Sequence, residues 1–270
     1  MSIFFKPDKD VVVTKAKAGH VPLLILRPEK PVANAPGVLW NHGGGYMMGM
    51  KEMVYGGYGQ ELVKRYGAVV VAPGYRLSWQ KPYPAAIEDC YDALKYLHDH
   101  REEFGIGKIM VGGESAGGGL TAALCMMARD RGEIHVAYQM PLYPMISNID
   151  TESSRDNHGK VWNTRLNHLG WKLYLRKNAK EAVSPYAAAA QQTDYTNLPP
   201  CYTFIGDGEP FYTETLQFVE NLKAAGVEAS ADVYHTDVHS FDTMQPETEL
   251  AQRASAAFYR HFEYAMEHYS

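Results

Sequence analysis

The run KIMVGGESAGGGL, residues 108–120, carries the strongest structural signal in this chain. An apolar, strand-like stretch leads into Gly113-Glu114-Ser115-Ala116-Gly117, and a helical pattern follows it directly. The pattern G-x-S-x-G between a strand and a helix is typical of a nucleophile elbow, a sharp turn that presents a serine side chain. Small residues are needed two positions before and after Ser115, because strand and helix pass closely there. The run therefore predicts a strand–turn–helix unit with Ser115 as a nucleophile.

The same alternation of strand and helix continues on both sides of this run. The strand-like runs are Val21–Leu26, Gly37–Trp40, Ala68–Ala72, Lys108–Gly112, His135–Met140, Cys201–Ile205 and Ala231–His235. The helical patterns cover about Tyr58–Tyr66, Ala85–His100, Ala116–Asp130, Tyr212–Ala225 and Glu249–His268. This rhythm predicts an α/β fold, a parallel sheet with helices on both faces. Reactive groups of such sheets gather beyond the carboxyl ends of the strands.

One segment interrupts the rhythm. Residues 144–183 contain no clean strand, but aromatic and aliphatic side chains cluster there: Trp162, Leu166, Leu169, Trp171 and Tyr174. We interpret the segment as a small helical insertion over the sheet edge, with additional core packing as the alternative. The expectation is one domain over residues 1–270 that carries this insertion.

Composition excludes several classes of protein. Lys plus Arg number 26 and Asp plus Glu 31, so the net charge of −5 argues against a nucleic-acid binder. The three cysteines show no pairing pattern, which favours a reducing compartment. No signal peptide and no apolar run long enough to span a membrane is evident, so we expect a cytoplasmic protein. No metal site is expected, because a helix would turn His98 and His100 to different faces.

A glycine-rich loop follows the strand-like run Gly37–Trp40. In Asn41-His42-Gly43-Gly44-Gly45-Tyr46, consecutive glycines allow backbone N–H groups to turn into a cavity. Ester hydrolysis needs such donors where the oxyanion forms, together with the N–H of the residue after the nucleophile. This assigns the oxyanion donors to Gly43, Gly44 and Ala116. His42 is expected to brace the loop rather than to transfer protons.

A serine nucleophile needs a histidine base and an acid that orients it. Among eleven histidines, His239 is the best base, because it lies in a loop after the last strand-like run. The loop after Ile205 offers Asp207 and Glu209 as the acid, with Glu214 a distant third. The pattern of the chain does not decide between Asp207 and Glu209.

These residues resemble the hormone-sensitive-lipase-like branch of the α/β-hydrolases, the bacterial family IV esterases. The matching motifs are HGGGY at 42–46, GESAGGG at 113–119, GYRL at 74–77, YPAAIED at 83–89, SPY at 184–186, GEPFYTET at 208–215 and VHSF at 238–241. The resemblance implies an α/β-hydrolase fold with a mostly parallel central sheet flanked by helices. It also implies a triad of Ser115, Glu209 and His239, because the family's acid directly precedes a proline. The implied activity is hydrolysis of short-acyl carboxylic esters, small-molecule substrates, without a cofactor.

The chain departs from the family pattern at several points. The acid is Glu209 where the family usually has Asp, and Ser240 replaces a glycine. Residues 1–36 are too few for the family's N-terminal helical cap, so we expect a reduced cap. A site left open in this way would be covered by the insertion or by a second subunit, and the sequence leaves a homo-oligomer open.

The acyl pocket and the reaction class also remain as hypotheses at this level. Tyr46, Met47 and Trp162 are expected to line the substrate groove, with ordinary packing as the alternative. An amidase or formamidase with the same triad is the second candidate activity. A non-catalytic ligand-binding protein on a hydrolase scaffold is the third, and it would be expected to lack the serine or the histidine.

Overall fold

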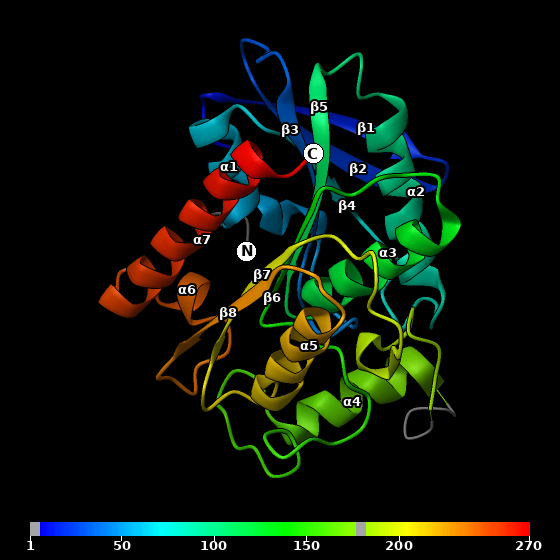
Figure 1. The fold of residues 1–270 in the computed structure, drawn as a ribbon, viewed down its shortest axis with the longest axis vertical. Coiled ribbons are helices and arrows are strands. Elements are labelled where there is room, and N and C mark those ends of the chain that lie inside the picture. Colours follow the sequence, from blue (N-terminus) through cyan, green and yellow to red (C-terminus); the bar gives the residue numbers. More distant parts are fainter. Residues whose placement is uncertain (1–5, 177–181) are drawn as a thin grey trace.

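An eight-stranded sheet forms the centre of the molecule in the computed structural model, which describes residues 6–176 and 182–270 (Figure 1). Its strands are β1 (Val11–Ala18), β2 (Val21–Pro28), β3 (Ala35–Asn41), β4 (Val69–Pro73), β5 (Ile106–Glu114), β6 (Tyr138–Leu142), β7 (Cys201–Gly206) and β8 (Ala229–Tyr234). The strand order is β1-β2-β4-β3-β5-β6-β7-β8. β1 pairs with β2 and β2 with β4 in antiparallel fashion, and all other neighbours are parallel. This is the mostly parallel sheet of an α/β-hydrolase fold.

The sequence predicted the central strands well and the edges less well. All seven residues of β3 are buried, as expected for a strand covered on both faces. β1 is missing from the prediction, because in VVVTKAKA only Val11 and Ala18 are buried and the pattern is weak. β6 begins at Tyr138, three positions after the predicted start at His135, although the Ala137 N–H just before it already donates to the Ile109 carbonyl of β5 over 2.8 Å.

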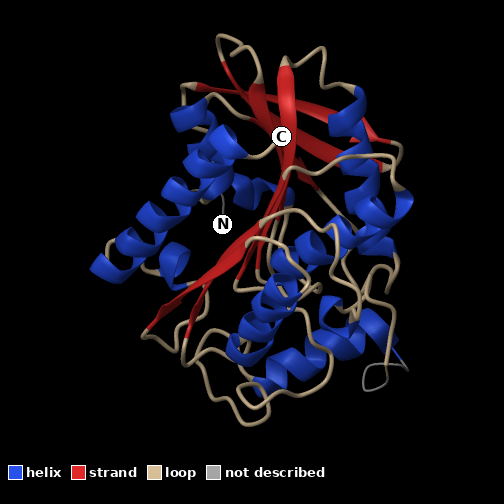
Figure 2. Cartoon of the chain, in the orientation of Figure 1, coloured by secondary structure: helices blue, strands red, loops and turns tan. Residues whose placement is uncertain are grey.

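Helices cover both faces of the sheet, as predicted (Figures 1 and 2). The elements are η1 (Lys51–Tyr55), α1 (Tyr58–Tyr66), α2 (Ala85–Asp99), α3 (Ala116–Arg131), α4 (Thr164–Leu175), η3 (Ala189–Gln191), α5 (Tyr212–Ala224), α6 (Phe241–Met244) and α7 (Glu249–His268). α1 and α7 lie on one face, and α2, α3 and α5 on the other. α3 is buried from Ala116 to Ala128, so its sequence is apolar all round rather than amphipathic.

Aromatic side chains join the sheet to the α1/α7 layer. The rings of Trp40 on β3, Tyr58 on α1 and Phe258 on α7 lie with their centroids 4.1 to 6.0 Å apart. Contacts at these separations add aromatic attraction to the area that the rings bury. The cluster fixes β3, and with it the loop that follows Asn41.

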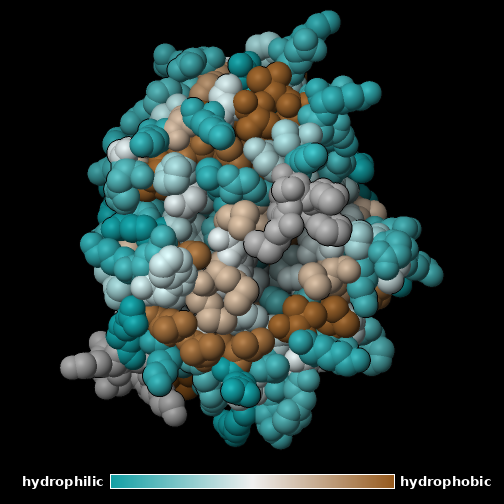
Figure 3. All heavy atoms as spheres, turned by 180° about the vertical axis from the view of Figure 1, so that it is seen from behind, coloured by the Kyte–Doolittle hydropathy of each residue, from teal (hydrophilic) through white to brown (hydrophobic). Residues whose placement is uncertain are grey.

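The predicted insertion at 144–183 lies between β6 and β7, and residues 177–181 of it fall outside the described structure. Its described part includes α4, which lies at the end of the sheet away from the C-terminus (Figure 1). The surface seen in Figure 3 is mostly hydrophilic, with apolar side chains gathered in separate patches. None of the helices in the described chain is long and apolar enough to cross a membrane.

Candidate active site

The predicted elbow joins β5 to α3. Ser115 adopts φ 56° and ψ −118°, a strained conformation in the positive-φ region. A Cβ atom on Gly113 would lie 2.6 Å from the Asn41 carbonyl oxygen, and one on Gly117 would lie 2.1 Å from the same atom. Larger residues would therefore collide with the end of β3. The elbow explains why glycine flanks the serine on both sides.

A continuous chain of hydrogen bonds links Ser115, His239 and Glu209. His239 Nε2 lies 2.8 Å from Ser115 Oγ, and His239 Nδ1 lies 2.5 Å from Glu209 Oε2. All three residues are buried, with exposures of 5%, 4% and 0%. The second carboxylate oxygen of Glu209 accepts the Gly206 N–H over 2.9 Å. The loops after β5, β7 and β8 thus bring together the predicted nucleophile, base and acid from distant parts of the chain.

The other two candidate acids lie elsewhere. Asp207 accepts a hydrogen bond from His235 over 2.8 Å and another from the Thr236 N–H over 3.1 Å. The bond from His235 holds the pKa of the Asp207 carboxyl below its usual range. Glu214 is buried on α5 and accepts the N–H groups of Ile146 and Ser147 over 2.7 and 3.0 Å. The structure therefore brings Glu209, and neither Asp207 nor Glu214, to the imidazole.

The predicted oxyanion loop lies against Ser115. A Cβ atom on Gly43 would lie 3.4 Å from Ser115 Cβ, and Ala116 is the first residue of α3. Within the described residues, the N–H groups of Gly43, Gly44 and Ala116 have no intramolecular acceptor. Unpaired donors beside a nucleophile can receive the developing negative charge of an attacked carbonyl.

His42 braces this loop, as the sequence suggested. Its Nδ1 donates to the Gly43 carbonyl over 2.8 Å, and its ring stacks on Tyr75 at 4.1 Å. Burial lowers the pKa of His42 to about 4. The imidazole is therefore neutral at ordinary pH and serves as a structural hydrogen-bond donor.

The three residues expected to line the groove differ in their surroundings. Tyr46 is 2% exposed, its hydroxyl donates to the Met145 carbonyl over 2.7 Å, and its ring stacks on Tyr174 at 4.2 Å. It packs in the core, and its backbone has a positive φ of 60°. Met47 is half-buried. Trp162 covers Gly45, where a Cβ atom would lie 2.1 Å from the ring.

Three residues around His239 were not found from the sequence. The rings of Tyr143 and Phe211 meet the imidazole nearly at right angles, each with centroids 5.2 Å away. The Tyr143 hydroxyl donates to Asp242 over 3.3 Å. Burial raises the pKa of Asp242 to about 6. One signal was available, since Tyr143 directly follows β6 and Phe211 follows Glu209 by two residues.

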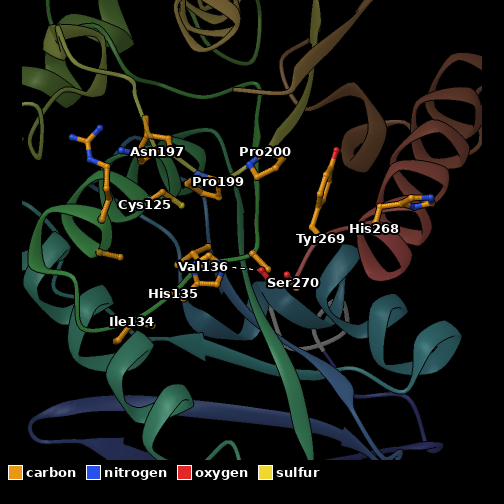
Figure 4. A pocket seen from close by; sticks show the side chains of 14 residues that line it. Cys125, Ile134, His135, Val136, Asn197, Pro199, Pro200, His268, Tyr269 and Ser270 are labelled. Carbon is orange, nitrogen blue, oxygen red and sulfur yellow. Dashed lines mark hydrogen bonds between the residues drawn. The ribbon is translucent and has the colours of Figure 1, made fainter. Parts of the chain in front are cut away.

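A separate pocket of about 520 Å³ lies at the opposite end of the sheet (Figure 4). It is lined by residues that precede β6 and β7 and by the last residues of the chain, and His135 Nε2 lies 2.7 Å from a Ser270 oxygen. None of Ser115, His239 and Glu209 lines it. No group of three metal-ligating side chains occurs among the residues that the structure describes.

Comparison with known proteins places this geometry in a family. Residues 38–243 match the alpha/beta hydrolase fold family. Esterase LipI of Mycobacterium tuberculosis is 30% identical over 227 residues, which cover 77% of this chain and 66% of that protein. Among solved structures, a bacterial heroin esterase superposes with a TM-score of 0.88 at 30% identity. The superposition covers 96% of this chain and 83% of the heroin esterase chain.

A second solved structure, an esterase of Pyrobaculum calidifontis, gives a TM-score of 0.84 at 32% identity and covers 94% of this chain and 84% of its own. The matched region contains both glycine motifs and all three residues of the hydrogen-bonded chain. The chain belongs to the α/β-hydrolase family, in its hormone-sensitive-lipase-like branch.

Proposed function

We propose that this protein is a serine carboxylesterase that hydrolyses short-acyl esters through Ser115, His239 and Glu209. Its family and the names of its relatives support the class of carboxylic ester hydrolase. The proposal for these three residues rests on the unbroken series of hydrogen bonds from Ser115 Oγ through His239 to Glu209, beside unpaired backbone donors.

In the first half-reaction, Ser115 Oγ attacks the ester carbonyl carbon while His239 Nε2 takes the hydroxyl proton. The carbonyl oxygen becomes an oxyanion, which the N–H groups of Gly43, Gly44 and Ala116 stabilise. Glu209 holds the Nδ1–H tautomer and stabilises the imidazolium that forms. The bond to the alcohol oxygen then breaks, and His239 returns the proton to the leaving alcohol.

Water completes the cycle at the acyl-enzyme. His239 takes a proton from the water as its oxygen attacks the acyl carbon, and the same backbone donors bind the second oxyanion. The bond to Ser115 Oγ breaks, the serine regains its proton from His239, and the carboxylic acid leaves. Positioned general-base catalysis contributes about 10²–10⁴-fold to such steps.

The restriction to short acyl groups rests on the surroundings of Ser115. Ser115 is only 5% exposed, and Trp162, with its ring centroid 6.4 Å from that of His239, fills the adjacent space above Gly45. A small acyl group needs less displacement of this ring than a long one.

The direct test compares wild-type protein with Ser115→Ala on p-nitrophenyl acetate, butyrate, octanoate and laurate. We expect turnover of the short esters and a loss of about 10⁶-fold in kcat for the variant, as for serine hydrolases that lose their nucleophile. A matched anilide series checks the amidase alternative. Folded wild-type protein without esterase turnover would contradict the proposal, and turnover of anilides alone would favour an amidase.

A further inference from the structure

The turn that carries Glu209 is held from two sides. On the β8 side, the Gly208 N–H donates to the Thr236 carbonyl over 3.0 Å, and Asp207 accepts the Thr236 N–H over 3.1 Å. These bonds tie the turn to the segment that leads to His239. They fix the residues before Glu209 and leave those after it to other contacts.

On the other side, the turn is held by the first part of the insertion. Ser153 Oγ donates to the Pro210 carbonyl over 2.8 Å and accepts the Thr213 N–H over 3.0 Å. Asn157 Nδ2 donates to the Gly208 carbonyl over 3.0 Å. The carbonyls of Gly208 and Pro210 flank Glu209 in the chain, so these two side chains bracket its backbone.

The same segment is anchored to α4. The Asn157 N–H donates to Thr164 Oγ1 over 2.7 Å, and that hydroxyl donates to the Ser154 carbonyl over 2.7 Å. Thr164 is the first residue of α4. A bonded path therefore runs from the insertion helix through Asn157 to the residue that bonds His239.

We propose that Ser153 and Asn157 are positioning residues that set the backbone of Glu209 at the distance a glutamate requires. The inference rests on the proposed function of Glu209. A glutamate is one methylene longer than an aspartate, so its backbone must stand further from the imidazole for the same carboxylate position. The hydrogen bonds from Ser153 and Asn157 hold the backbone of Glu209 at that distance. The insertion thereby helps to position the proposed catalytic acid.

The first test replaces Ser153 and Asn157 singly with Ala and measures kcat and KM on p-nitrophenyl acetate. We expect kcat to fall about 10-fold in each variant with KM little changed, because misplacing a catalytic group by a fraction of an ångström lowers the chemical step. His168→Ala is the matched control: it removes a 2.7 Å bond to Asp150 within the insertion that does not reach the turn.

A second readout is the far-downfield proton resonance of a His239 Nδ1–H bonded to Glu209. The resonance should weaken or move upfield in Ser153→Ala and Asn157→Ala and stay in place in His168→Ala. A merely structural role would lower stability without moving this signal. Unchanged kcat and an unchanged resonance in both variants would overturn the inference while leaving the esterase proposal intact.

A double-mutant cycle separates positioning from general loosening. Glu209→Asp alone should lower kcat about 100-fold, because the held backbone keeps the shorter carboxylate away from His239. In the Ser153→Ala/Asn157→Ala background the turn can shift, so Glu209→Asp should lower kcat by only about 10-fold or less. Strict additivity of the two effects would also overturn the inference. An inactive wild-type protein would instead refute the proposed function itself.

Discussion

Glu209 has both carboxylate oxygens committed, one to the Gly206 N–H and one to His239. The two bonds leave the side chain, which has no solvent exposure, a single orientation. Asp207, two residues earlier, is similarly committed to His235 and Thr236. Two acids in one loop therefore have separate hydrogen-bond partners, which the order of residues alone could not assign.

Substitution of these two acids distinguishes their roles. Glu209→Gln keeps the shape of the side chain but removes the charge that fixes the tautomer of His239, so kcat should fall about 10⁴-fold. Asp207→Asn should keep kcat within about 3-fold, because its amide oxygen can still accept the Thr236 N–H and its side chain does not contact His239. Steady-state kinetics on p-nitrophenyl acetate, with circular dichroism as a control for folding, checks the pair. Equal losses in both variants would contradict the assignment.

The insertion at residues 144–183 supplies a tryptophan that lies directly beside the candidate site. Trp162 precedes α4 and covers Gly45, next to the predicted oxyanion donors. The indole N–H of Trp162 is buried and has no hydrogen-bond partner among the described residues. The ring is therefore held by packing alone, and its removal opens space rather than breaking a polar network.

Trp162→Ala should shift the acyl-length preference toward longer chains. Removal of the indole leaves a cavity beside Ser115 that octanoate can fill, and the ratio of octanoate to acetate kcat/KM should rise about 10-fold or more, as expected for a few buried methylenes. Leu169→Ala, an exposed position on α4, serves as the control. An unchanged ratio in Trp162→Ala would mean that the ring packs without limiting the acyl group.

At the level of elements, periodicity predicts what lies in the centre of the sheet and misses what lies at its edges. The strong apolar runs of β3 and β5 and the whole of α1 and α7 follow from their patterns. β1 does not, because an edge strand with exposed lysines carries little signal. The contacts of His239 with Tyr143 and Phe211 also escape prediction, since they depend on turn geometry such as the φ of 34° at Tyr143.

Across the whole molecule, buried carboxyl groups couple stability to pH. Burial raises the pKa of Glu214 from 4.5 to about 8, so the folded protein keeps this proton over a range where the unfolded chain has lost it. A group whose pKa is raised on folding favours the folded state at low pH. The contribution of Glu214 to the free energy of unfolding therefore declines as pH rises from about 4.5 toward 8.

Glu214→Gln tests this coupling. The amide oxygen can still accept the Ile146 and Ser147 N–H groups, but the side chain no longer titrates. The free energy of unfolding of the wild type should fall relative to that of the variant between pH 5 and 8, with a slope that approaches about 1.4 kcal/mol per pH unit. Urea unfolding at several pH values measures the difference. Parallel curves would show that Glu214 is ionised in the folded state.

Ser115 and His239 are 124 residues apart in sequence, yet their side chains share a hydrogen bond. The parallel sheet between them is built from crossovers, and such long-range pairings form slowly during folding. A chain emerging from the ribosome would complete the elbow early, and His239 would not reach Ser115 until the β7–β8 unit docked. Recovery of activity during refolding therefore shows that the complete native topology has formed. Recovery of the helical circular-dichroism signal does not show this.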